Sequence, residues 1–296
     1  MTSGGGTWGA WLKGARTKLS VAGQDDPDAL AEFALADLLH VGRADLVRLE
    51  NTGMDAALRE KADAWVERLA RGEPLAYVVG WAPFLSHRIR CDRRALIPRP
   101  ETEELARRAL DCRDLWSRPA PAAADIGTGT GCIALALSLA HPKAVVTGVD
   151  VSADALDLAR ENAAALGATG ARWMESDGLR EFGDASLDAI ISNAPYVATG
   201  EWRALNRTLR DWEPRLALDG GEDGLDVIRR IIADAPRVLR PGGRIFLEIG
   251  ETQGAAVRDL IREAGLQEAA VDHDLFGRIR FASARAADAT RAAAPD

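Results

Sequence analysis

Several residue types are scarce in this 296-residue chain, and each shortage excludes a class of protein. Its three cysteines, Cys91, Cys112 and Cys132, are scattered and odd in number, so we expect no disulfide framework and a cytoplasmic protein. The four histidines show no ligand spacing with one another or with cysteine, so no metal site is expected. No apolar run approaches the roughly 18 residues of a membrane span, and the N-terminus does not resemble a secretion signal.

Basic residues are also in the minority, with 37 Lys and Arg against 45 Asp and Glu, and the net charge is -8. A broad nucleic-acid-binding surface is therefore not expected. Hydrophobic residues make up 47% of the chain and charged residues 28%, an ordinary composition for a soluble protein. The length is sufficient for a catalytic domain and a smaller second domain.

Residues 1–73 are predicted to form an N-terminal helical domain. Asp26 and Pro27 resemble an N-cap and a first-turn proline. A second helix is expected from Met54 to Arg71, ended by Gly72. The residues expected on the apolar faces of these two helices are Leu30, Phe33, Ala34 and Leu38, and then Leu58, Ala62, Trp65 and Leu69.

Residues 74–100 are predicted to be a β-hairpin linker between two domains. Strand-like pieces lie between Phe84 and Ile97, around the turn-prone Cys91-Asp92-Arg93. Pro98 and Pro100 make the following loop stiff, since neither fits inside a helix. A helix is expected to open at Glu101, with acids in its first turn as the helix dipole prefers.

Residues 101–284 show alternating strand and helix patterns. This alternation predicts an α/β domain of the Rossmann-like kind, with a mostly parallel sheet covered by helices on both faces. The last two strands have no helix between them and are expected to pair as an antiparallel edge. Residues 285–296 are expected to be a disordered tail. The expected strands are 122–126, 144–149, 171–175, 187–192, 243–249, 267–272 and 278–284, and the expected helices are 131–140, 153–166, 224–239 and 252–264.

A glycine-rich segment, Gly127-Thr128-Gly129-Thr130-Gly131, lies between an apolar strand pattern and a helix pattern. Glycines there let the backbone approach a nucleotide-like cofactor that a Cβ would exclude. Asp150 ends the next strand, where a carboxylate can accept hydrogen bonds from both ribose hydroxyls. Dinucleotide enzymes instead use Gly-x-Gly-x-x-Gly. The alternating glycines, with Asp125 preceding them to orient the methionine end, favour S-adenosylmethionine over a dinucleotide.

Ser176-Asp177-Gly178 follows the third expected strand. Asp177 can accept a hydrogen bond from the adenine amino group, and Gly178 can contribute only backbone contacts. An ordinary turn is the alternative, since Asp-Gly is a common turn pair.

Asn193-Ala194-Pro195-Tyr196 follows a buried strand pattern, which places a carboxamide at the C-terminal edge of the sheet. Such a site suits a planar NH2 group. The side-chain oxygen of Asn193 and the backbone carbonyl of Ala194 can accept its two N–H bonds, Pro195 stiffens the turn, and Tyr196 walls the pocket. Together with a methyl donor, the segment indicates methyl transfer to an amide or amine nitrogen.

Residues 74 to about 282 resemble the protein-(glutamine-N5) methyltransferases that modify peptide-chain release factors. The resemblance implies methylation of the glutamine in the Gly-Gly-Gln motif of class I release factors, and a helical N-terminal domain that contacts the release factor. The matching segments begin at Pro74 (Pro-Leu-Ala-Tyr-Val-Val-Gly), Leu96 (Leu-Ile-Pro-Arg-Pro-Glu-Thr-Glu), Gly127, Ser192, Glu213 (Glu-Pro-Arg-Leu-Ala-Leu), Gly220 (Gly-Gly-Glu-Asp-Gly-Leu-Asp), Glu248 (Glu-Ile-Gly, with Gln253) and Asp274 (Asp-Leu-Phe-Gly-Arg).

Two positions depart from that family. Its tetrapeptide is usually Asn-Pro-Pro-Tyr, and alanine at 194 keeps the backbone carbonyl that is implied to hold the amide. Relatives can carry an aromatic at position 178 that packs on adenine, so Gly178 implies looser packing or compensation by an aromatic such as Trp173.

Three other functions are compatible with parts of the pattern. A sister group methylates a glutamine in a ribosomal protein. DNA adenine N6 methyltransferases share an Asn/Asp-Pro-Pro-Tyr motif, but need a basic DNA-facing surface that this composition does not predict. The alanine at 194 also allows a translation-factor binding module whose catalytic site has decayed. No direct contact with nucleic acid or membrane is expected, and a monomer is favoured.

Overall fold

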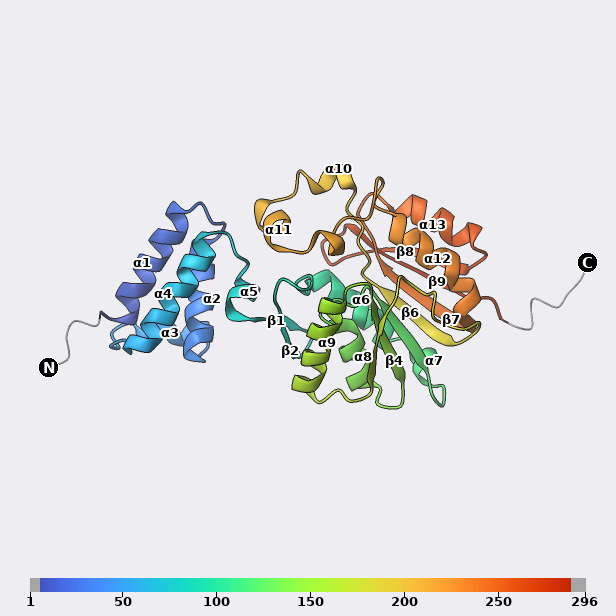
Figure 1. Cartoon of the computed structure of the whole chain (residues 1–296), viewed down its shortest axis with the longest axis horizontal. Helices are drawn as coiled ribbons and strands as arrows, with labels where there is room; N and C mark the ends of the chain where they lie inside the picture. Colours follow the sequence, from blue (N-terminus) through green and yellow to red (C-terminus); the bar gives the residue numbers. More distant parts are fainter. Residues whose placement is uncertain (1–5, 289–296) are drawn as a thin grey trace, which may run out of the picture. The chain divides into compact units, whose positions relative to one another are not determined.

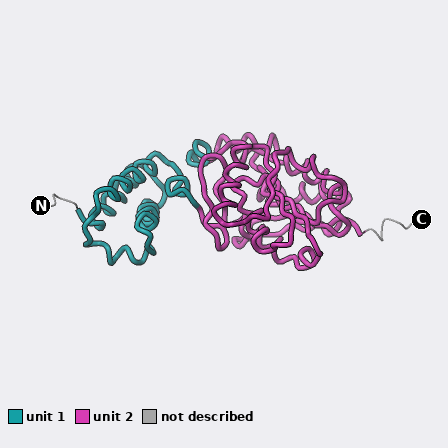
Figure 2. The backbone as a smooth tube through the Cα atoms, turned by 60° about the horizontal axis from the view of Figure 1, so that its bottom comes forward, with its two compact units in different colours: residues 1–81, 206–212 teal, residues 82–205, 213–296 magenta. Residues whose placement is uncertain are grey.

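The computed structural model describes residues 6–288 (Figure 1). Its chain divides into two compact units. The first unit contains the residues up to Trp81 and the separate segment Asn206–Trp212, and the second contains Ala82–Leu205 and the chain from Glu213 onward (Figure 2). The predicted linker, residues 74–100, spans the boundary at Trp81. Among the described residues, no helix is long and apolar enough to cross a bilayer.

The first unit is helical, as its sequence pattern predicts. Asp26 accepts a hydrogen bond from the Ala29 backbone N–H, and Pro27 takes the first helical position, so the predicted helix start is confirmed. Gly72, at φ +85°, follows the longest helix. The helices are α1 (Trp8–Val21), α2 (Pro27–Leu39), α3 (Leu46–Leu49), α4 (Ala56–Ala70), α5 (Leu75–Val79) and α11 (Arg207–Trp212), with a 3-10 turn, η1 (Arg43–Asp45).

Two residues predicted for the apolar faces lie at the surface instead. Phe33 is 46% exposed and Leu58 is 37% exposed. The buried face of α2 is set by Ala31, Ala34, Leu35 and Leu38, because α1 and α4 both pack against it. Phe33 falls outside that face, where the Arg43 guanidinium lies 4.2 Å from its ring centroid.

The linker forms a hairpin, but its turn lies elsewhere than predicted. Strands β1 (Trp81–Phe84) and β2 (His87–Arg90) are joined at Leu85 and Ser86. Phe84 and Ile89 are both fully buried, and this fixes the register across so short a turn. The turn-prone Cys91-Asp92-Arg93 follows β2, and there Asp92 accepts a hydrogen bond from the Arg94 backbone N–H.

The second unit is built on a seven-stranded sheet in the order β5-β4-β3-β6-β7-β9-β8. Five strands are parallel, β9 is antiparallel to both β7 and β8, and the predicted antiparallel edge is confirmed. The strands are β3 (Ala122–Ile126), β4 (Val145–Asp150), β5 (Ala171–Glu175), β6 (Leu187–Ser192), β7 (Leu239–Glu248), β8 (Gln267–His273) and β9 (Ile279–Arg285).

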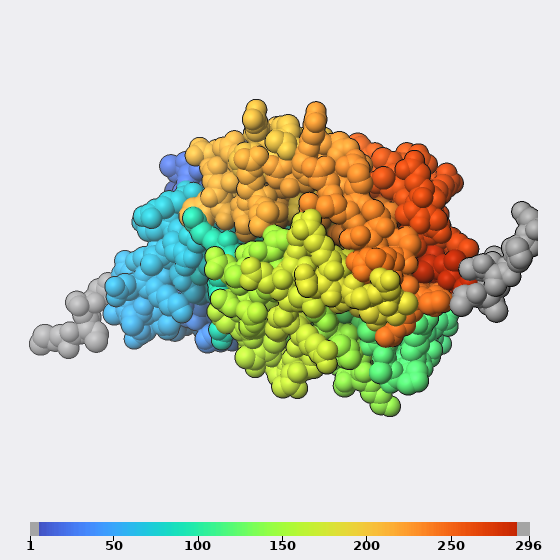
Figure 3. Space-filling model, turned by 45° about the vertical axis from the view of Figure 1, so that its right-hand side comes forward, coloured from blue at the N-terminus to red at the C-terminus, as the bar shows by residue number. Residues whose placement is uncertain are grey.

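Helices cover both faces of this sheet. Alternate residues of β3 point to opposite faces, so Ala124 packs in the core beneath α12 while Ala123 packs in the core beneath α8. Arg237 of α12 also donates to the backbone of Leu179 and Phe182, and the yellow segment after β5 lies against orange α12 in Figure 3. The helices are α6 (Pro100–Leu110), α7 (Arg113–Trp116), α8 (Cys132–Ala140), α9 (Ala153–Leu166), α10 (Thr199–Trp202), α12 (Asp226–Val238) and α13 (Gly254–Glu263), with a 3-10 turn, η2 (Arg215–Ala217).

The start of the predicted C-terminal tail is structured. Arg285 ends β9 and pairs with Asp288 at 2.7 Å, while Ala286 is buried and donates to the Gly243 carbonyl. The hydrogen bonding of β9 to β7 therefore continues past residues 278–284, the strand that the sequence pattern predicts. The remainder of the predicted tail, residues 289–296, lies outside the described residues.

Three strand ends meet at one edge of the sheet. Ile126 of β3 is in register with Val149 of β4 on one side and with Ser192 of β6 on the other. The residues that follow these positions therefore emerge side by side. The chain crosses from one side of β3 to the other between β5 and β6, and such a switch point is where open α/β sheets place their ligands.

Candidate functional site

The glycine-rich turn leaves β3 and enters α8 as predicted. Gly127, Gly129 and Gly131 have φ values of +72°, +54° and +81°, which disfavour any residue with a Cβ. The backbone N–H groups of Gly127 and Thr128 both donate to the Val149 carbonyl at 2.9 Å. The turn is therefore fixed against the neighbouring strand and exposes backbone to the space above it.

Asp150 lies beside this turn. Its Oδ2 accepts from the Gly129 backbone N–H at 2.9 Å, and its Oδ1 accepts from the Ser152 N–H at 3.0 Å. Burial raises the pKa of Asp150, while these backbone donors favour its charged form. Each oxygen retains a lone pair, so the carboxylate can still accept hydrogen bonds from a ligand.

Asp125, which is predicted to orient the methionine end of the cofactor, lies buried beneath the glycine turn and is not among the residues that line the adjacent cavity. It is 1% exposed, and its Oδ2 accepts from the Thr128 hydroxyl at 2.6 Å and from the Ala134 N–H at 3.1 Å. Its Oδ1 has no hydrogen-bond partner within the described part of the chain. Burial raises the pKa of Asp125 to about 7. The side chain therefore supports the turn from beneath.

Trp173 also lies beneath the turn, so the idea that it packs on adenine is wrong. A Cβ added to Gly148 would lie 2.5 Å from the Trp173 ring, and one added to Gly131 would lie 2.8 Å from it. The indole fills the space that these two glycines leave. It stabilises the underside of the turn instead of lining the pocket.

A cavity of about 350 Å³ opens above the turn, entirely within the second unit. Of the predicted site residues, Gly131, Ala194 and Tyr196, like Asp125, do not line it. No aromatic residue is among its described lining residues. The predicted residues that line it are Gly127, Thr128, Gly129, Thr130, Asp150, Asp177, Gly178, Asn193 and Pro195, and others include Arg94, Leu96, Ile97, Pro98, Thr102, Pro214, Val227 and Arg230.

One end of this cavity carries Asp177 and Gly178. Asp177 lies 3.2 Å from Arg180 and 3.5 Å from Arg230, so it is held between two cations. Gly178 has φ +72°, and a Cβ there would meet no atom within 4 Å. The space beside Gly178 is therefore open.

Asn193 lies at the end of β6 and its carboxamide is anchored. Its Nδ2 donates to the Thr102 hydroxyl at 2.9 Å, and that hydroxyl donates to Glu248 Oε2 at 2.8 Å. Thr102 comes from the first turn of α6, and Glu248 ends β7. Our sequence analysis assigned no role to either residue, although both belong to segments that carry the family resemblance.

Tyr196 reaches the same carboxylate. Its phenol donates to Glu248 Oε1 at 3.3 Å, and burial followed by the charge of Glu248 raises the pKa of Tyr196. Burial raises the pKa of Glu248 to about 7, opposed by the hydrogen bond from Thr102 and by nearby Arg280. Tyr196, which was predicted to wall the pocket, does not line the cavity. Its side chain contacts Glu248 behind Asn193 instead.

The turn after Asn193 is wrapped by the segment from Gly220 to Gly224. A Cβ on Gly220 would lie 2.5 Å from the Pro195 carbonyl oxygen, and one on Gly224 would lie 2.3 Å from that of Tyr196. Gln253 Nε2 donates to the Tyr196 carbonyl at 2.9 Å. These glycines therefore permit a close backbone approach that holds the turn in place.

The proline-rich segment is bound to the Glu213-Pro214 segment. Glu213 is 4% exposed, and it accepts from the Ile97 backbone N–H at 3.1 Å and pairs with Arg99. Ile97 and Pro214 both line the cavity. This buried ion pair explains why two segments so distant in sequence share one wall.

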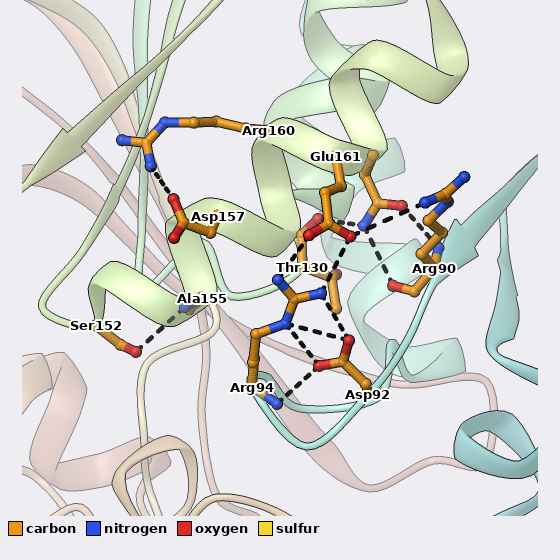
Figure 4. A network of polar contacts seen from close by, with 10 residues as sticks. Arg90, Asp92, Arg94, Thr130, Ser152, Ala155, Asp157, Arg160 and Glu161 are labelled. Carbon is orange, nitrogen blue, oxygen red and sulfur yellow. Dashed lines mark hydrogen bonds and ion pairs between the residues drawn. The ribbon is translucent and has the colours of Figure 1, made fainter.

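The hairpin is joined to the glycine turn through α9. Asn162, which is 1% exposed, accepts from the Arg90 N–H at 2.7 Å and donates to the carbonyls of Arg90 and Thr130. Arg94, in the cavity wall, is held between Asp92 and Glu161 (Figure 4). Among residues 6–288, no group of three His, Cys, Asp or Glu residues is placed to hold a metal ion.

Comparison with known proteins identifies both parts of the chain. The model of the "Methyltransferase small domain" family matches residues 112–220, and that of the "PrmC N-terminal domain" matches residues 10–80. A release factor glutamine methyltransferase of Cereibacter sphaeroides is 42% identical over 93% of this chain and 96% of its own. One of Deinococcus radiodurans is 40% identical over 93% of this chain and 97% of its own.

Solved structures are similar to part of this chain. A methyltransferase from Pyrococcus furiosus has a TM-score of 0.50, is 18% identical and covers 67% of this chain and 88% of its own. A release factor-specific protein-(glutamine-N5) methyltransferase from Alicyclobacillus acidocaldarius is 30% identical, covers 64% of this chain and 94% of its own, and has a TM-score of 0.40.

Proposed function

The chain belongs to the release factor glutamine methyltransferase family, and we propose that it methylates the side-chain amide nitrogen (N5) of the glutamine in the Gly-Gly-Gln motif of class I release factors. The observation that carries this proposal is the anchored carboxamide of Asn193 at the rim of the cavity. An amide acceptor there suits a substrate that must present an N–H2 group.

S-adenosylmethionine is the methyl donor, and the chain fits it. The glycine turn brings backbone to the cavity floor without Cβ atoms, and Asp150 lines the cavity with acceptor capacity that suits ribose hydroxyls. Asp177 supplies an acceptor for the adenine amino group. The Oδ1 of Asp125 has no hydrogen-bond partner among the described residues, and the cationic methionine end is its proposed partner. When bound, the donor supplies a methyl group on a positively charged sulfur.

Asn193 and Ala194 hold the substrate amide in the proposed reaction. A primary amide nitrogen is a weak nucleophile because its lone pair is delocalised into the carbonyl. The Asn193 Oδ1 and the Ala194 carbonyl accept its two N–H bonds and direct the nitrogen toward the methyl group. No strong base is required, since the proton leaves to solvent after the methyl has transferred.

The proposed partner is the release factor as a protein substrate, bound without nucleic acid. Release factors act where translation occurs, so we place the reaction in the cytoplasm, with the enzyme as a monomer. The N-terminal helical unit is the proposed contact for the body of the release factor, since a matching domain accompanies the methyltransferase domain.

Incubation with labelled S-adenosylmethionine and a release factor tests this function. We expect label on the wild-type release factor and none on a variant whose loop glutamine is alanine. Label that is independent of this glutamine would contradict the proposal. A ribosomal-protein substrate and a DNA duplex serve as parallel reactions that test the other two nitrogen-methylating functions.

A further inference from the structure

Four side chains form a chain of hydrogen bonds behind the rim of the cavity. The Asn193 amide donates to the Thr102 hydroxyl, which donates to one oxygen of Glu248, and the Tyr196 phenol donates to the other. Thr102 is 3% exposed and Glu248 is 1% exposed. The sequence brings them from three separate segments: α6, the end of β7 and the turn after β6.

The chemistry of these groups gives the chain a direction. An ionised carboxylate only accepts hydrogen bonds, so Glu248 requires Thr102 to use its single proton toward it. The Thr102 oxygen is then an acceptor on its other side. Only the NH2 end of the Asn193 amide can satisfy it, and the Oδ1 end is consequently turned away from Thr102.

We infer that Thr102 and Glu248 are positioning residues that orient the Asn193 carboxamide with its oxygen toward the substrate, and so select a glutamine amide over a carboxylate. This inference rests on the proposed function. Neither residue needs to touch the substrate, because both act through Asn193. Gln253 holds the turn after Asn193 through its hydrogen bond to the Tyr196 carbonyl. The backbone of the site is therefore fixed independently of Thr102 and Glu248.

The selection follows from donor and acceptor matching. A glutamine amide offers two N–H donors to Asn193 Oδ1 and the Ala194 carbonyl. A glutamate side chain offers only acceptors, and its charge would face two carbonyl oxygens. An Asn193 amide turned the other way would present NH2, which suits glutamate and leaves one of the two glutamine N–H groups unpaired.

The environment of Glu248 links this orientation to its charge. The charged and titratable groups around it are Tyr196 on the turn, Arg280 on β9 and Glu101 on α6, and Glu101 is itself paired with Arg278 at 2.9 Å. Burial raises the pKa of Glu248 to about 7. A protonated Glu248 becomes a donor at one oxygen, and the fixed direction of the chain is then lost.

The primary test compares Thr102→Val with Thr102→Ser in the full-length enzyme. Valine removes the hydroxyl at nearly the same volume, and serine keeps it. We measure kcat, KM for the release factor, the Kd for S-adenosylmethionine, and inhibition by a release factor whose loop glutamine is glutamate. Thr102→Val is expected to lower kcat by about 100-fold through misorientation of Asn193, with the cofactor Kd unchanged.

The decisive readout is the ratio of the KM for the glutamine release factor to the inhibition constant of the glutamate release factor. We expect the glutamate release factor to inhibit Thr102→Val more strongly, relative to the KM of the glutamine form, than it inhibits wild type. Thr102→Ser should restore most of the lost kcat and the wild-type ratio. A purely structural role for Thr102 would alter stability and cofactor affinity while leaving this ratio unchanged.

Glu248→Gln supplies a second test that does not depend on the valine variant folding. Wild-type kcat should rise as the pH increases through about 7, because only the ionised carboxylate enforces the direction. Glu248→Gln should lose this rise. An unchanged ratio in Thr102→Val, or a pH profile shared by Glu248→Gln and wild type, overturns the inference. A wild-type enzyme that leaves the release factor unmethylated contradicts the proposed function instead.

Discussion

The Nδ2 of Asn162 in α9 donates a 2.9 Å hydrogen bond to the backbone carbonyl of Thr130 in the glycine turn. The same side chain bonds both backbone groups of Arg90 at the end of β2. One buried amide therefore joins the hairpin at the start of the second unit to the glycine turn.

Asn162→Ala should weaken both the fold and the cofactor site. It leaves the buried Thr130 carbonyl and the partly buried backbone groups of Arg90 unpaired, which costs about 1–3 kcal/mol in the free energy of unfolding. Arg160→Ala is the matched control, since Arg160 is an exposed residue on the same helix and pairs with exposed Asp157. Chemical denaturation and cofactor titration measure the two effects. Equal stability of both variants would contradict this role.

Asn193→Ala should abolish methylation while the cofactor remains bound. The variant removes the acceptor that holds the substrate amide and leaves the glycine turn and Asp150 in place, so the Kd for S-adenosylmethionine should change by no more than about tenfold. Isothermal titration with single-turnover methylation separates the two quantities. Parallel loss of both would mean that Asn193 mainly binds the cofactor.

Ala194→Pro restores the residue that relatives usually carry. Ala194 is 1% exposed and does not have positive φ, and Pro195 already biases it toward extended backbone. We expect activity to be retained and the free energy of unfolding to rise by about 0.4–1 kcal/mol, because proline restricts the unfolded chain. Thermal unfolding and kcat report on this. A lower free energy of unfolding would show that the turn requires a backbone φ at position 194 that proline cannot adopt.

Gly148→Ala should disrupt the packing beneath the glycine turn. The new Cβ would lie 2.5 Å from the Trp173 ring and 2.8 Å from the Thr128 hydroxyl, and overpacking of this kind costs about 1–3 kcal/mol. Gly183→Ala is the control, because a Cβ there meets no atom within 4 Å. It should change stability by less than about 0.5 kcal/mol. Weaker cofactor binding in Gly148→Ala alone is the expected pattern.

Buried Asp125 should make the fold less stable as the pH rises. Its folded pKa of about 7 exceeds its unfolded value near 3.8, so its stabilising contribution is complete below pH 3.8 and is lost as the pH increases through about 7. Over that interval the slope is about 1.4 kcal/mol per pH unit for one such group. Asp125→Asn should reduce the fall in unfolding free energy between pH 5 and pH 7.5. Identical pH dependence in wild type and variant would contradict this.

The strands and the longer helices of the second unit could be predicted from sequence because their signals are local, whereas the short helices α7 and α10 were not predicted. The strands from Ala122 and Leu187 have the predicted bounds, since each is a short, mostly apolar run beside turn residues. The glycine turn and Asp150 were also predictable, because positive φ and the position at a strand end follow from residue type and order.

The contacts between distant segments could not be predicted in this way. Thr102 and Glu248 lie in ordinary-looking helix and strand patterns, and only the tertiary fold brings them within 3 Å of one another. Trp173 illustrates the opposite error. Its alternation along β5 does not reveal that Gly131 and Gly148 leave a space for the indole beneath the turn. Phe33 was misplaced because periodicity alone does not show which helices pack on which side.

The composition of the first unit has a consequence for protein synthesis. Residues 206–212 belong to this unit, and Trp212 and Thr208 lie close to Gly72, at the end of α4. A ribosome that has completed Trp81 must still add 131 residues (212 minus 81) before the last segment of the unit exists. At about 5–20 residues per second this is a delay on the order of ten seconds. The apolar clusters that contain Leu19, Leu35 and Leu69 include no residue of 206–212, so the N-terminal helices can pack before this segment is made, and α11 joins them only after the delay.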